Sequence, residues 1–523
     1  MKPLLTLLSG ATLALAVGCA PHDRDHTAHA THAAHEHDAG VVDFPITANA
    51  QAQEEFQTGL VHLHHMMYEQ ARPHFQAAAD ADPEAAMAHW GIAMTSFQPL
   101  WHPTSEAGLE RGRAAVARAR EIGAATEREE GYITAVEAFF TDPEPARPGR
   151  AEDHEARVYA WMQAQRELHE AYPHDVDAAA FYALAEVCYA MTQFSPDEEH
   201  DYERERRAGA LLEEQLANHP EHPGLFHYLI HAYDSSELAH KAEEIARAYD
   251  ELAPDTVHAL HMPSHIFVRL GIWEDTVRWN ERSAEAAQRE FDIDPHATAH
   301  YVHALDYMMY GYLQLGDEPR ARQTLERVLA MEEIYPAAFA GYNTAAPQAR
   351  YFLEQRKWAE AAALEPRQPD ALAWEDFPAA EALIHYARGL GAARSGDLEQ
   401  AQAERQRIDE LVGMLREAGD RYWAYMSDAL GMAVEAWVLY EQGETDEALA
   451  RMREAAELED AMDKSPVTPG EVLPVRELYG DLLLKEGRVE QARQAFEASL
   501  ERTPNRRNAL AGLERAAAAE QEP

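Results

Sequence analysis

Cysteine is nearly absent from this chain, which holds only Cys19 and Cys188. One pair supplies no disulfide framework, and no paired-cysteine metal motif is present. Cys188 lies among Tyr, Ala and Met residues, a setting typical of a small buried apolar side chain. The sequence also lacks a Gly-rich phosphate loop and a Gly-x-Ser-x-Gly elbow, which removes several common enzyme classes.

Positive charge is scarce as well. The 45 Lys and Arg residues stand against 92 Asp and Glu residues, so the formal net charge is −47 at pH 7. A field of this sign repels phosphate backbones, argues against nucleic acid as a partner, and concentrates cations near the surface. Hydrophobic residues make up 46% of the 523 positions, enough for a large core in two to four domains or one long repeat array.

Long apolar runs are limited to residues 4–17, and we interpret residues 1–18 as a signal peptide. The sequence Ala16-Val17-Gly18-Cys19 resembles the lipobox of bacterial lipoproteins, in which the cysteine is lipidated and begins the mature chain. The resemblance implies a lipid anchor at Cys19, and Ala20 after it implies the outer membrane, with the protein facing the periplasm. The alternative is an ordinary secreted protein that is cleaved nearby.

Histidine is abundant instead, with 28 residues, and part of it lies directly after Cys19. Residues 19–49 have no hydrophobic period, which predicts a disordered tether. Its histidines are His22, His26, His29, His32, His35 and His37. The tether is either a solvated spacer or a weak, exchangeable collector of Zn²⁺, Cu²⁺ or Ni²⁺.

From about residue 50 onward the apolar residues follow a helical period, with Pro and Gly mainly at predicted helix ends. Two segments share one spacing of small, aromatic and Pro positions: Gly480, Ala492, Phe496, Ser499 and Pro504, and Gly59, Ala71, Phe75, Ala78 and Pro83. This spacing resembles the tetratricopeptide repeat (TPR), a pair of antiparallel helices of 34 residues. We therefore predict an all-α fold, an α-solenoid of TPR-like hairpins. Proline clusters divide it into an N-terminal array over 50–335, an irregular Pro-rich break over 336–380, and a C-terminal array over 381–523.

Histidines recur at the repeat interval between residues 222 and 310. His227 and His261 are 34 residues apart, and so are His231 and His265. Spacing of i and i+4 places each pair, His227 with His231 and His261 with His265, on one helix face. The resemblance to TPR proteins implies that these positions, with His258 and His303, line the concave groove of the array.

Paired imidazoles on neighbouring helices predict a metal site, because helices that pack about 8–10 Å apart let both pairs converge. The predicted ligands are His227, His231, His258, His261, His265, His303 and Asp306. Asp234 is expected to ligate or to orient a ring, and Tyr310 and Arg269 are further groove residues. Nitrogen and oxygen donors without thiolate favour a divalent transition metal of the Zn, Cu, Ni or Fe class, with Zn or Cu first. A second group, His62, His64, His65 and His89, is interpreted as ordinary packing.

Three sequence motifs are similar to motifs of a group of bacterial TPR proteins without an assigned activity. They are His222-Pro223-Gly224 leading to His231-Ala232-Tyr233-Asp234, then His261-Met262-Pro263-Ser264-His265-Ile266, and Ala88-His89-Trp90-Gly91-Ile92-Ala93. The similarity covers roughly residues 50–340, and it implies a fold and a groove but no reaction.

These observations predict a lipid-anchored protein of the cell envelope that binds a transition metal in its groove, as a metal-binding or docking protein. A metal-free scaffold for peptide or protein partners is the first alternative. A metal-dependent hydrolase or oxidase is the second, and it is disfavoured because no general base is clearly placed beside the histidines.

Overall fold

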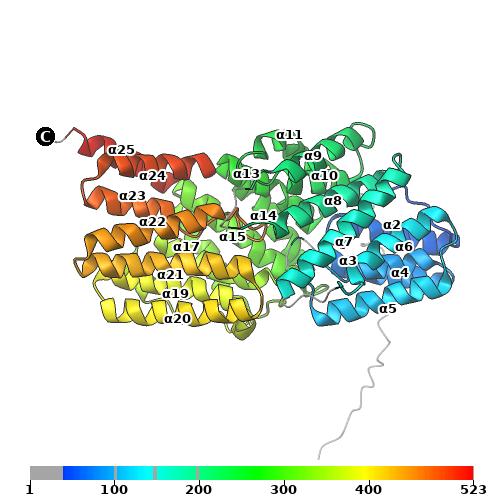
Figure 1. Cartoon of the computed structure of the whole chain (residues 1–523), viewed down its shortest axis with the longest axis horizontal. Coiled ribbons are helices and arrows are strands. Elements are labelled where there is room, and N and C mark those ends of the chain that lie inside the picture. The colour runs from blue at the N-terminus through cyan, green and yellow to red at the C-terminus, as the bar shows by residue number, and fades with distance from the viewer. Residues whose placement is uncertain (1–38, 99, 101–102, 145–149, 196–199, 522–523) are drawn as a thin grey trace, which may run out of the picture. The chain divides into compact units, whose positions relative to one another are not determined.

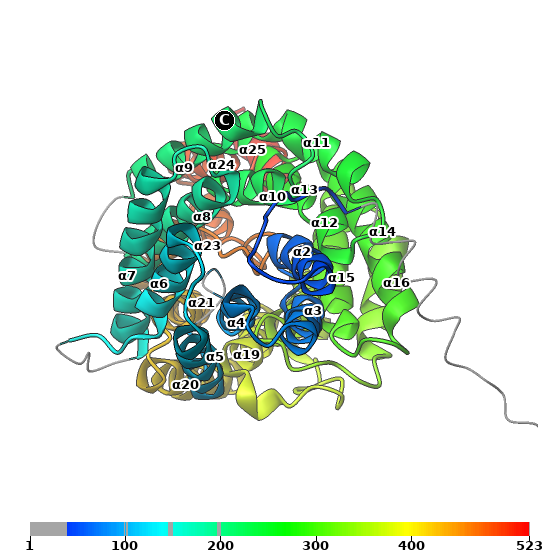
Figure 2. The same cartoon turned by 90° about the vertical axis from the view of Figure 1, so that its right-hand side faces the viewer.

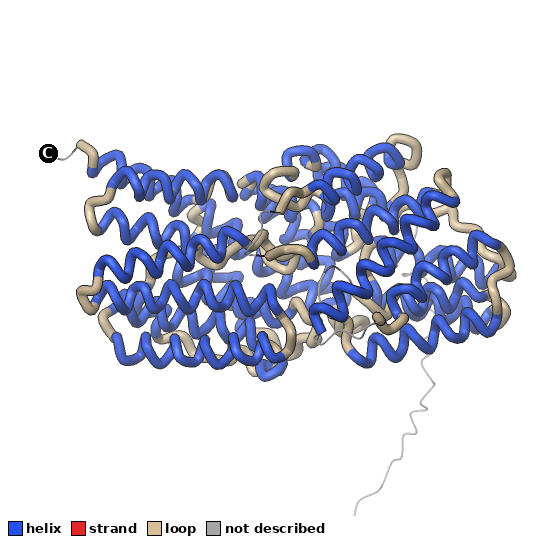
Figure 3. The backbone as a smooth tube through the Cα atoms, viewed as in Figure 1, coloured by secondary structure: helices blue, strands red, loops and turns tan. Residues whose placement is uncertain are grey.

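The computed structural model describes residues 39–98, 100, 103–144, 150–195 and 200–521, and Ala39 onward belongs to one compact unit. The regular structure of these residues is helical (Figure 3). The helices are α2 (Ala50–His64), α3 (Tyr68–Ala81), α4 (Ala86–Met94), α5 (Glu106–Ile122), α6 (Glu127–Phe140), α7 (Arg150–Ala171), α8 (Val176–Thr192), α9 (Glu203–Leu216), α10 (Pro223–Ala232), η2 (Ala239–Lys241), α11 (Glu243–Leu252), α12 (Val257–His261), α13 (Pro263–Leu270), α14 (Trp273–Glu290), α15 (Ala297–Leu315), α16 (Glu318–Leu329), α17 (Ala340–Leu353), α18 (Trp358–Ala362), η3 (Trp374–Asp376), α19 (Pro378–Ser395), α20 (Leu398–Glu417), α21 (Arg421–Glu441), α22 (Thr445–Ala461), α23 (Val475–Lys485), α24 (Val489–Arg502) and α25 (Arg507–Ala519).

Successive helices pack as hairpins in chain order, from α2 at the blue end to α25 at the red end (Figure 1). The small residues of the repeat pattern stand where two helices approach most closely. A Cβ atom on Gly59 would lie 3.0 Å from the Phe75 ring, and one on Gly480 would lie 2.7 Å from the Phe496 ring. In both repeats the glycine therefore allows its helix to pack closely against the aromatic ring sixteen residues later. The prediction of an all-α solenoid of TPR-like hairpins is confirmed.

The helix α2, the first among the described residues, lies inside the curve formed by the later helices. Figure 2 shows α2 next to α4 and α10, and both pairs of helices are in contact. The residues at its end bond to the helices around it: His64 Nδ1 lies 3.0 Å from the Tyr228 hydroxyl, and His65 Nδ1 lies 2.9 Å from the Tyr249 hydroxyl. The inner side of the solenoid is thus filled by its own N-terminal helix, and this contact buries the side chains on α10 that face it.

Two regions differ from the prediction. Residues 39–49, expected to belong to the disordered tether, pack on the helices, because Phe44 is an apolar ring that the core buries completely. Residues 336–380, expected to be irregular, contain α17, α18 and η3, and no domain boundary falls there, since residues 39–521 form one unit. Pro347 lies within α17 without ending it.

The signal peptide, Cys19 and the tether histidines up to His37 lie outside the described residues. Among the helices that the structure does describe, none combines the length and the apolar character needed to cross a bilayer.

Phe44 provides a test of the ordered N-terminal segment. Its ring packs 4.9 Å from Tyr132, 5.3 Å from Phe56 and 5.9 Å from Trp90, measured between ring centres. We expect Phe44→Leu to lower the free energy of unfolding by about 1–2 kcal/mol, because contacts are lost in a packed core. Urea unfolding measures the change. Val41→Ala, at an exposed position of the same segment, is the control and should stay within about 0.5 kcal/mol of the parent. If Phe44→Leu and Val41→Ala lower the free energy of unfolding equally, the Phe44 ring is not part of the packed core.

Candidate metal centre

Two sets of three histidines meet inside the N-terminal half of the solenoid. The first set, here called trio 1, is His227 and His231 from α10 with His258 from α12. The ring centre of His227 lies 4.9 Å from that of His231 and 5.0 Å from that of His258. One nitrogen from each of the three rings lies within 4.8 Å of the other two. The i, i+4 pair on α10 thus receives its third partner from the next inner helix.

The second set, trio 2, is His261 at the end of α12, His265 on α13 and His303 on α15. His261 Nε2 lies 3.0 Å from His265 Nε2, and the ring centres of His261 and His303 are 4.2 Å apart. The chain bends between α12 and α13, where Pro263 begins the second helix. Both rings nevertheless point to the same side as His303.

The two trios are neighbours. The ring centres of His231 and His265 are 5.6 Å apart, and those of His258 and His261 are 5.9 Å apart. All six side chains are buried, with an exposed fraction of 7% or less. The arrangement can hold two cations side by side, each on three nitrogens, with positions left for further ligands.

Backbone and side-chain acceptors orient three of the rings. His227 Nδ1 lies 2.7 Å from the His64 carbonyl oxygen, and His261 Nδ1 lies 2.7 Å from Asn280 Oδ1. His265 Nδ1 lies 2.9 Å from Asp234 Oδ2. Such contacts hold Nδ1 in its protonated form and leave Nε2 as the ligand atom, as in histidine metal sites. His227 Nε2 is buried and has no hydrogen-bond partner among the described residues.

Burial keeps these rings neutral. It lowers the pKa of His231 to about 3, and it lowers the pKa values of His227, His258, His261 and His303 well below the ordinary value, with the neighbouring imidazoles adding to the effect. Neutral imidazole is the form that binds metal ions. The trios therefore need no deprotonation at neutral pH to accept a cation.

Asp234 links trio 2 to distant parts of the chain. Its carboxylate accepts hydrogen bonds from Arg269 Nε at 2.9 Å and from Lys464 Nζ at 2.9 Å, besides the contact with His265. Burial alone would raise the pKa of Asp234, but Lys464 and Arg269 lower it well below the ordinary value. Burial in turn lowers the pKa of Lys464 to about 8. Asp234 is thus a charged residue that orients His265.

The connection between α22 and α23, here called the α22–α23 loop (residues 462–474), closes the other side of the trios. Besides Lys464 it carries Asp463, which lies 2.6 Å from Arg269, and the carbonyl oxygen of Thr468, which accepts from the Tyr307 hydroxyl at 3.1 Å. The Tyr307 ring centre is 4.5 Å from that of His261. The sequence-based prediction missed Tyr307, although it follows His303 by four positions on α15. It also missed Asn280 and Lys464, for which no local pattern exists.

Two predicted site residues lie apart from the trios. Asp306 is buried and faces Arg350, whose Nε is 3.4 Å from its Oδ1, and burial raises the pKa of Asp306 to about 6. The Tyr310 hydroxyl accepts from Arg506 Nη1 at 2.8 Å. The structure therefore brings the six predicted histidines together, places Asp234 and Arg269 beside trio 2, and holds Asp306 and Tyr310 in separate polar contacts.

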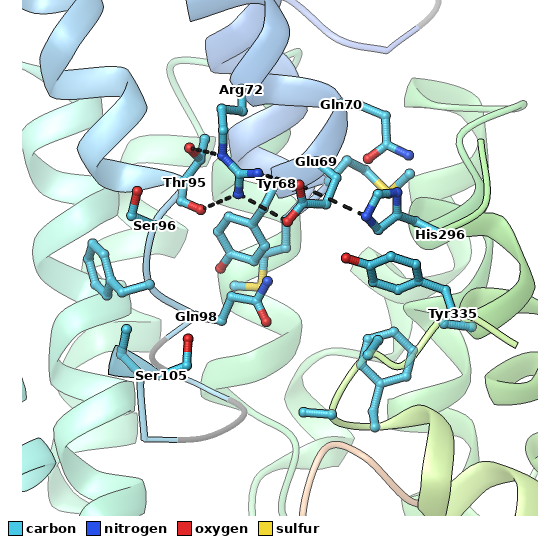
Figure 4. A pocket seen from close by; sticks show the side chains of 18 of the residues that line it. Tyr68, Glu69, Gln70, Arg72, Thr95, Ser96, Gln98, Ser105, His296 and Tyr335 are labelled. Carbon is cyan, nitrogen blue, oxygen red and sulfur yellow. Dashed lines mark hydrogen bonds and ion pairs between the residues drawn. The ribbon is translucent and has the colours of Figure 1, made fainter. Parts of the chain in front are cut away.

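A cavity of about 330 Å³ lies near the trios, on the side of α3 and α15. Figure 4 shows Arg72, Glu69 and Thr95 on one side of it, with His296 and Tyr335 facing them. Two further lining residues reach the histidines: His300 lies 5.6 Å from His258, and Phe339 lies 5.4 Å from His303, between ring centres. One layer of side chains thus separates this cavity from both trios.

No family model and no curated protein matches the chain. Solved structures align with it at low similarity. Yeast Tom70 is 12% identical over 90% of this chain and 95% of that chain, with a TM-score of 0.34. The Cut9–Hcn1 hetero-tetramer of the APC/C is 11% identical over 90% and 96%, with a TM-score of 0.30. The P58(IPK) TPR domain is 11% identical over 91% and 100%, with a TM-score of 0.20. The fold assignment therefore depends on the helix order and packing described above.

Proposed function

We propose that this protein binds transition-metal ions in its interior, one at trio 1 and one at trio 2. The observation that carries the proposal is the convergence of six buried imidazoles into two sets, with the ligand atoms of each set within 4.8 Å of one another. All-nitrogen sites favour Zn²⁺ or Cu²⁺ over harder cations such as Mg²⁺. The negative charge of the chain draws cations toward its surface.

Storage or transfer of the metal fits the surroundings better than catalysis does. Three protein ligands leave a coordination position that a hydrolase or oxidase would use. Asp306, the carboxylate predicted among the ligands, is held by Arg350 instead. The Tyr307 hydroxyl donates to carbonyl oxygens, and burial raises its pKa well above the ordinary value. Neither group is free to act as a base at the trios.

We also propose that the protein is anchored at Cys19 and faces the periplasm, and that the His-rich segment collects metal for the interior. Both proposals rest on the sequence, since residues 1–38 lie outside the described part. The cavity that His300 and Phe339 line lies one layer of side chains from the trios, and we propose that metal enters from that side.

A metal-free docking scaffold is the other candidate, and the TPR-like repeat fold supports it more directly than it supports metal binding, because stacked hairpins offer long surfaces to protein partners. The trios themselves are buried and unsuited to contact a partner. A docking surface would therefore lie elsewhere on the solenoid, and its use would not depend on the histidines.

Metal content tests the proposal. The protein is purified without an affinity tag, with the six tether histidines changed to Ala and residues 39–49 retained, because Phe44 belongs to the core. We expect His227→Ala/His261→Ala, which disables both trios, to hold about two fewer metal ions per chain by mass spectrometry. His385→Ala is the control, since His385 bonds to Glu404 on a distant pair of helices. A parent protein that contains no metal and takes up neither Zn²⁺ nor Cu²⁺ at micromolar concentration would refute metal binding and favour the scaffold.

A further inference from the structure

A third group of ligand-type side chains lies outside both trios. His64 ends α2, Asp177 lies in the first turn of α8, and His222 directly precedes α10. His64 Nε2 is 2.8 Å from Asp177 Oδ1, and His222 Nε2 is 3.3 Å from the same atom. Three segments that are far apart in the chain thus present two imidazoles and one carboxylate to a single point.

These spacings match the edges of a coordination polyhedron. Ligand bonds of about 2.0–2.1 Å, usual for Zn²⁺ with nitrogen and oxygen, place neighbouring ligand atoms roughly 3 Å apart. One ligand atom from each of the three residues lies within 4.8 Å of the other two, and all three side chains are buried. The group can therefore close on a cation with small rotations of the side chains.

The charge of Asp177 is the second observation. Its carboxylate is completely buried, and among the described residues no Lys or Arg forms an ion pair with it. Arg128, the cation beside it, pairs with Asp175 instead, at 2.6 Å. Asp177 Oδ2 and His222 Nδ1 have no hydrogen-bond partner among the described residues. The ion-pair partners of Asp177 are the imidazoles of His64 and His222, which carry a positive charge only when protonated. A bound cation would supply a full positive charge beside this buried carboxylate, so the site favours one.

The ring of His64 is held in the orientation that such a site requires. Its Nδ1 lies 3.0 Å from the Tyr228 hydroxyl, and the ring stacks on Phe181 at 5.0 Å between centres. A Cβ atom at Gly224 would lie 2.3 Å from His64 Nδ1, so the glycine allows the close approach of α10. Without a cation, His64 Nε2–H donates to Asp177 Oδ1 and the Tyr228 hydroxyl donates to Nδ1. A bound ion would take the place of the Nε2 proton, Nδ1 would then donate to the Tyr228 oxygen, and the Nε2 lone pair would face the ion beside the carboxylate.

We propose that His64, Asp177 and His222 bind one divalent cation, separate from the two ions of the trios. Two imidazoles and one carboxylate form a harder donor set than three imidazoles, which suits Zn²⁺, Fe²⁺ or Co²⁺ and leaves positions open. The site shares no residue with the trios and does not rest on the function proposed for them.

A surface hollow of about 700 Å³ borders this site at His222. His222 lines it, and so does Asp175, two residues before Asp177. The other charged and imidazole residues of the rim are Asp43, Arg128, His174, His219 and Glu221, and Arg128 pairs with Asp175. Carboxylates and imidazoles at the rim attract cations, and they stand where an ion would enter.

The test uses Co²⁺ as the probe and a background in which both trios are disabled, His227→Ala/His261→Ala, with the six tether histidines changed to Ala. We expect this protein to bind one Co²⁺ per chain, measured by titration calorimetry and by visible absorption. Adding Asp177→Asn, or His222→Gln in a separate protein, weakens the binding of Co²⁺ by at least about 100-fold. Glu186→Gln is the matched control, since Glu186 is a buried carboxylate on the same helix that pairs with Arg204.

Two results overturn the proposal: a trio-disabled background that folds and takes up no Co²⁺, or folded Asp177→Asn and His222→Gln proteins that bind Co²⁺ as tightly as the background does. Circular dichroism verifies folding, and the two single changes guard against one of them failing to fold. Failure of the trios is seen separately, as equal metal content in the parent and in the His227→Ala/His261→Ala protein.

Discussion

Acidification from pH 7 to pH 4 is expected to lower the free energy of unfolding on the order of 10 kcal/mol, enough to unfold the protein. Burial lowers the pKa of His64 and of His65 to about 4 and that of His231 to about 3, against 6.5 for a free imidazole. Below pH 6.5 these three imidazoles are protonated in the unfolded chain but stay neutral in the folded protein. Stability is therefore fully present above pH 6.5 and is lost as the pH falls toward the folded pKa values. At about 1.4 kcal/mol per pKa unit, each ring contributes roughly 3 kcal/mol or more.

Urea unfolding at a series of pH values, with a chelator present, measures the effect. His65→Gln removes one of these rings and should reduce the slope of the unfolding free energy against pH by about one proton between pH 6 and pH 4. His385→Gln is the control. Burial lowers the pKa of His385, but hydrogen bonds that its ring donates to the Glu381 and Glu404 carboxylates outweigh burial and raise this pKa, so its contribution to stability is present below pH 6.5 and is lost as the pH rises. A free energy of unfolding that stays constant between pH 7 and pH 4.5 would contradict the buried neutral histidines.

Replacement of Arg506 by Met is expected to lower the free energy of unfolding by about 3–5 kcal/mol. The guanidinium group is completely buried just before α25 and binds Glu477 Oε1 at 2.6 Å, Glu354 Oε1 at 2.6 Å and the Tyr310 hydroxyl at 2.8 Å. Removal of the cation leaves two buried carboxylates, one from α23 and one next to α17, without their partner. The cost arises from these uncompensated charges more than from the lost bonds.

Thermal and urea unfolding of three proteins separates these causes. Arg506→Met carries the full cost, and the triple change Arg506→Met/Glu354→Gln/Glu477→Gln should recover most of it, because the charges are removed together. Arg493→Met, which breaks partly exposed ion pairs to Glu490 and Glu497, should change stability by less than about 1 kcal/mol. If Arg493→Met lowers the free energy of unfolding as much as Arg506→Met does, the buried ion pairs of Arg506 contribute no more to stability than exposed ones, which contradicts the prediction.

The spacing of residues within each repeat was enough to predict the helical hairpins of the fold. The spacing of Gly59 and Phe75, repeated at Gly480 and Phe496, predicted hairpins that the structure confirms, since both glycines contact the rings that the pattern assigns to them. The 34-residue interval placed His227 and His261 at equivalent positions on neighbouring inner helices. Position within a repeat depends on nearby residues, and it is therefore readable from a single sequence.

Contacts between segments that are far apart in the chain could not be predicted from the spacing of residues. The third metal-type group joins His64 to Asp177, 113 residues away, and Lys464 reaches Asp234 across 230 residues. No periodicity encodes these pairings, because they depend on how far the solenoid curves. The same limit explains Asp306, which the helical register places near the histidines but which Arg350, 44 residues later, holds instead.

Contacts of α2 and of the α22–α23 loop with the middle of the chain are expected to change how the molecule unfolds. In an open repeat array each hairpin touches only its neighbours, so the array frays from its ends and its stability grows with the number of repeats. Here α2 packs on α10, and the α22–α23 loop bonds to Asp234, Arg269 and Tyr307 in the middle of the chain. Loss of either end would loosen the centre directly. The array behaves as one cooperative body whose interior is complete only after nearly the whole chain has been synthesised, so its folding cannot simply follow the order of its repeats.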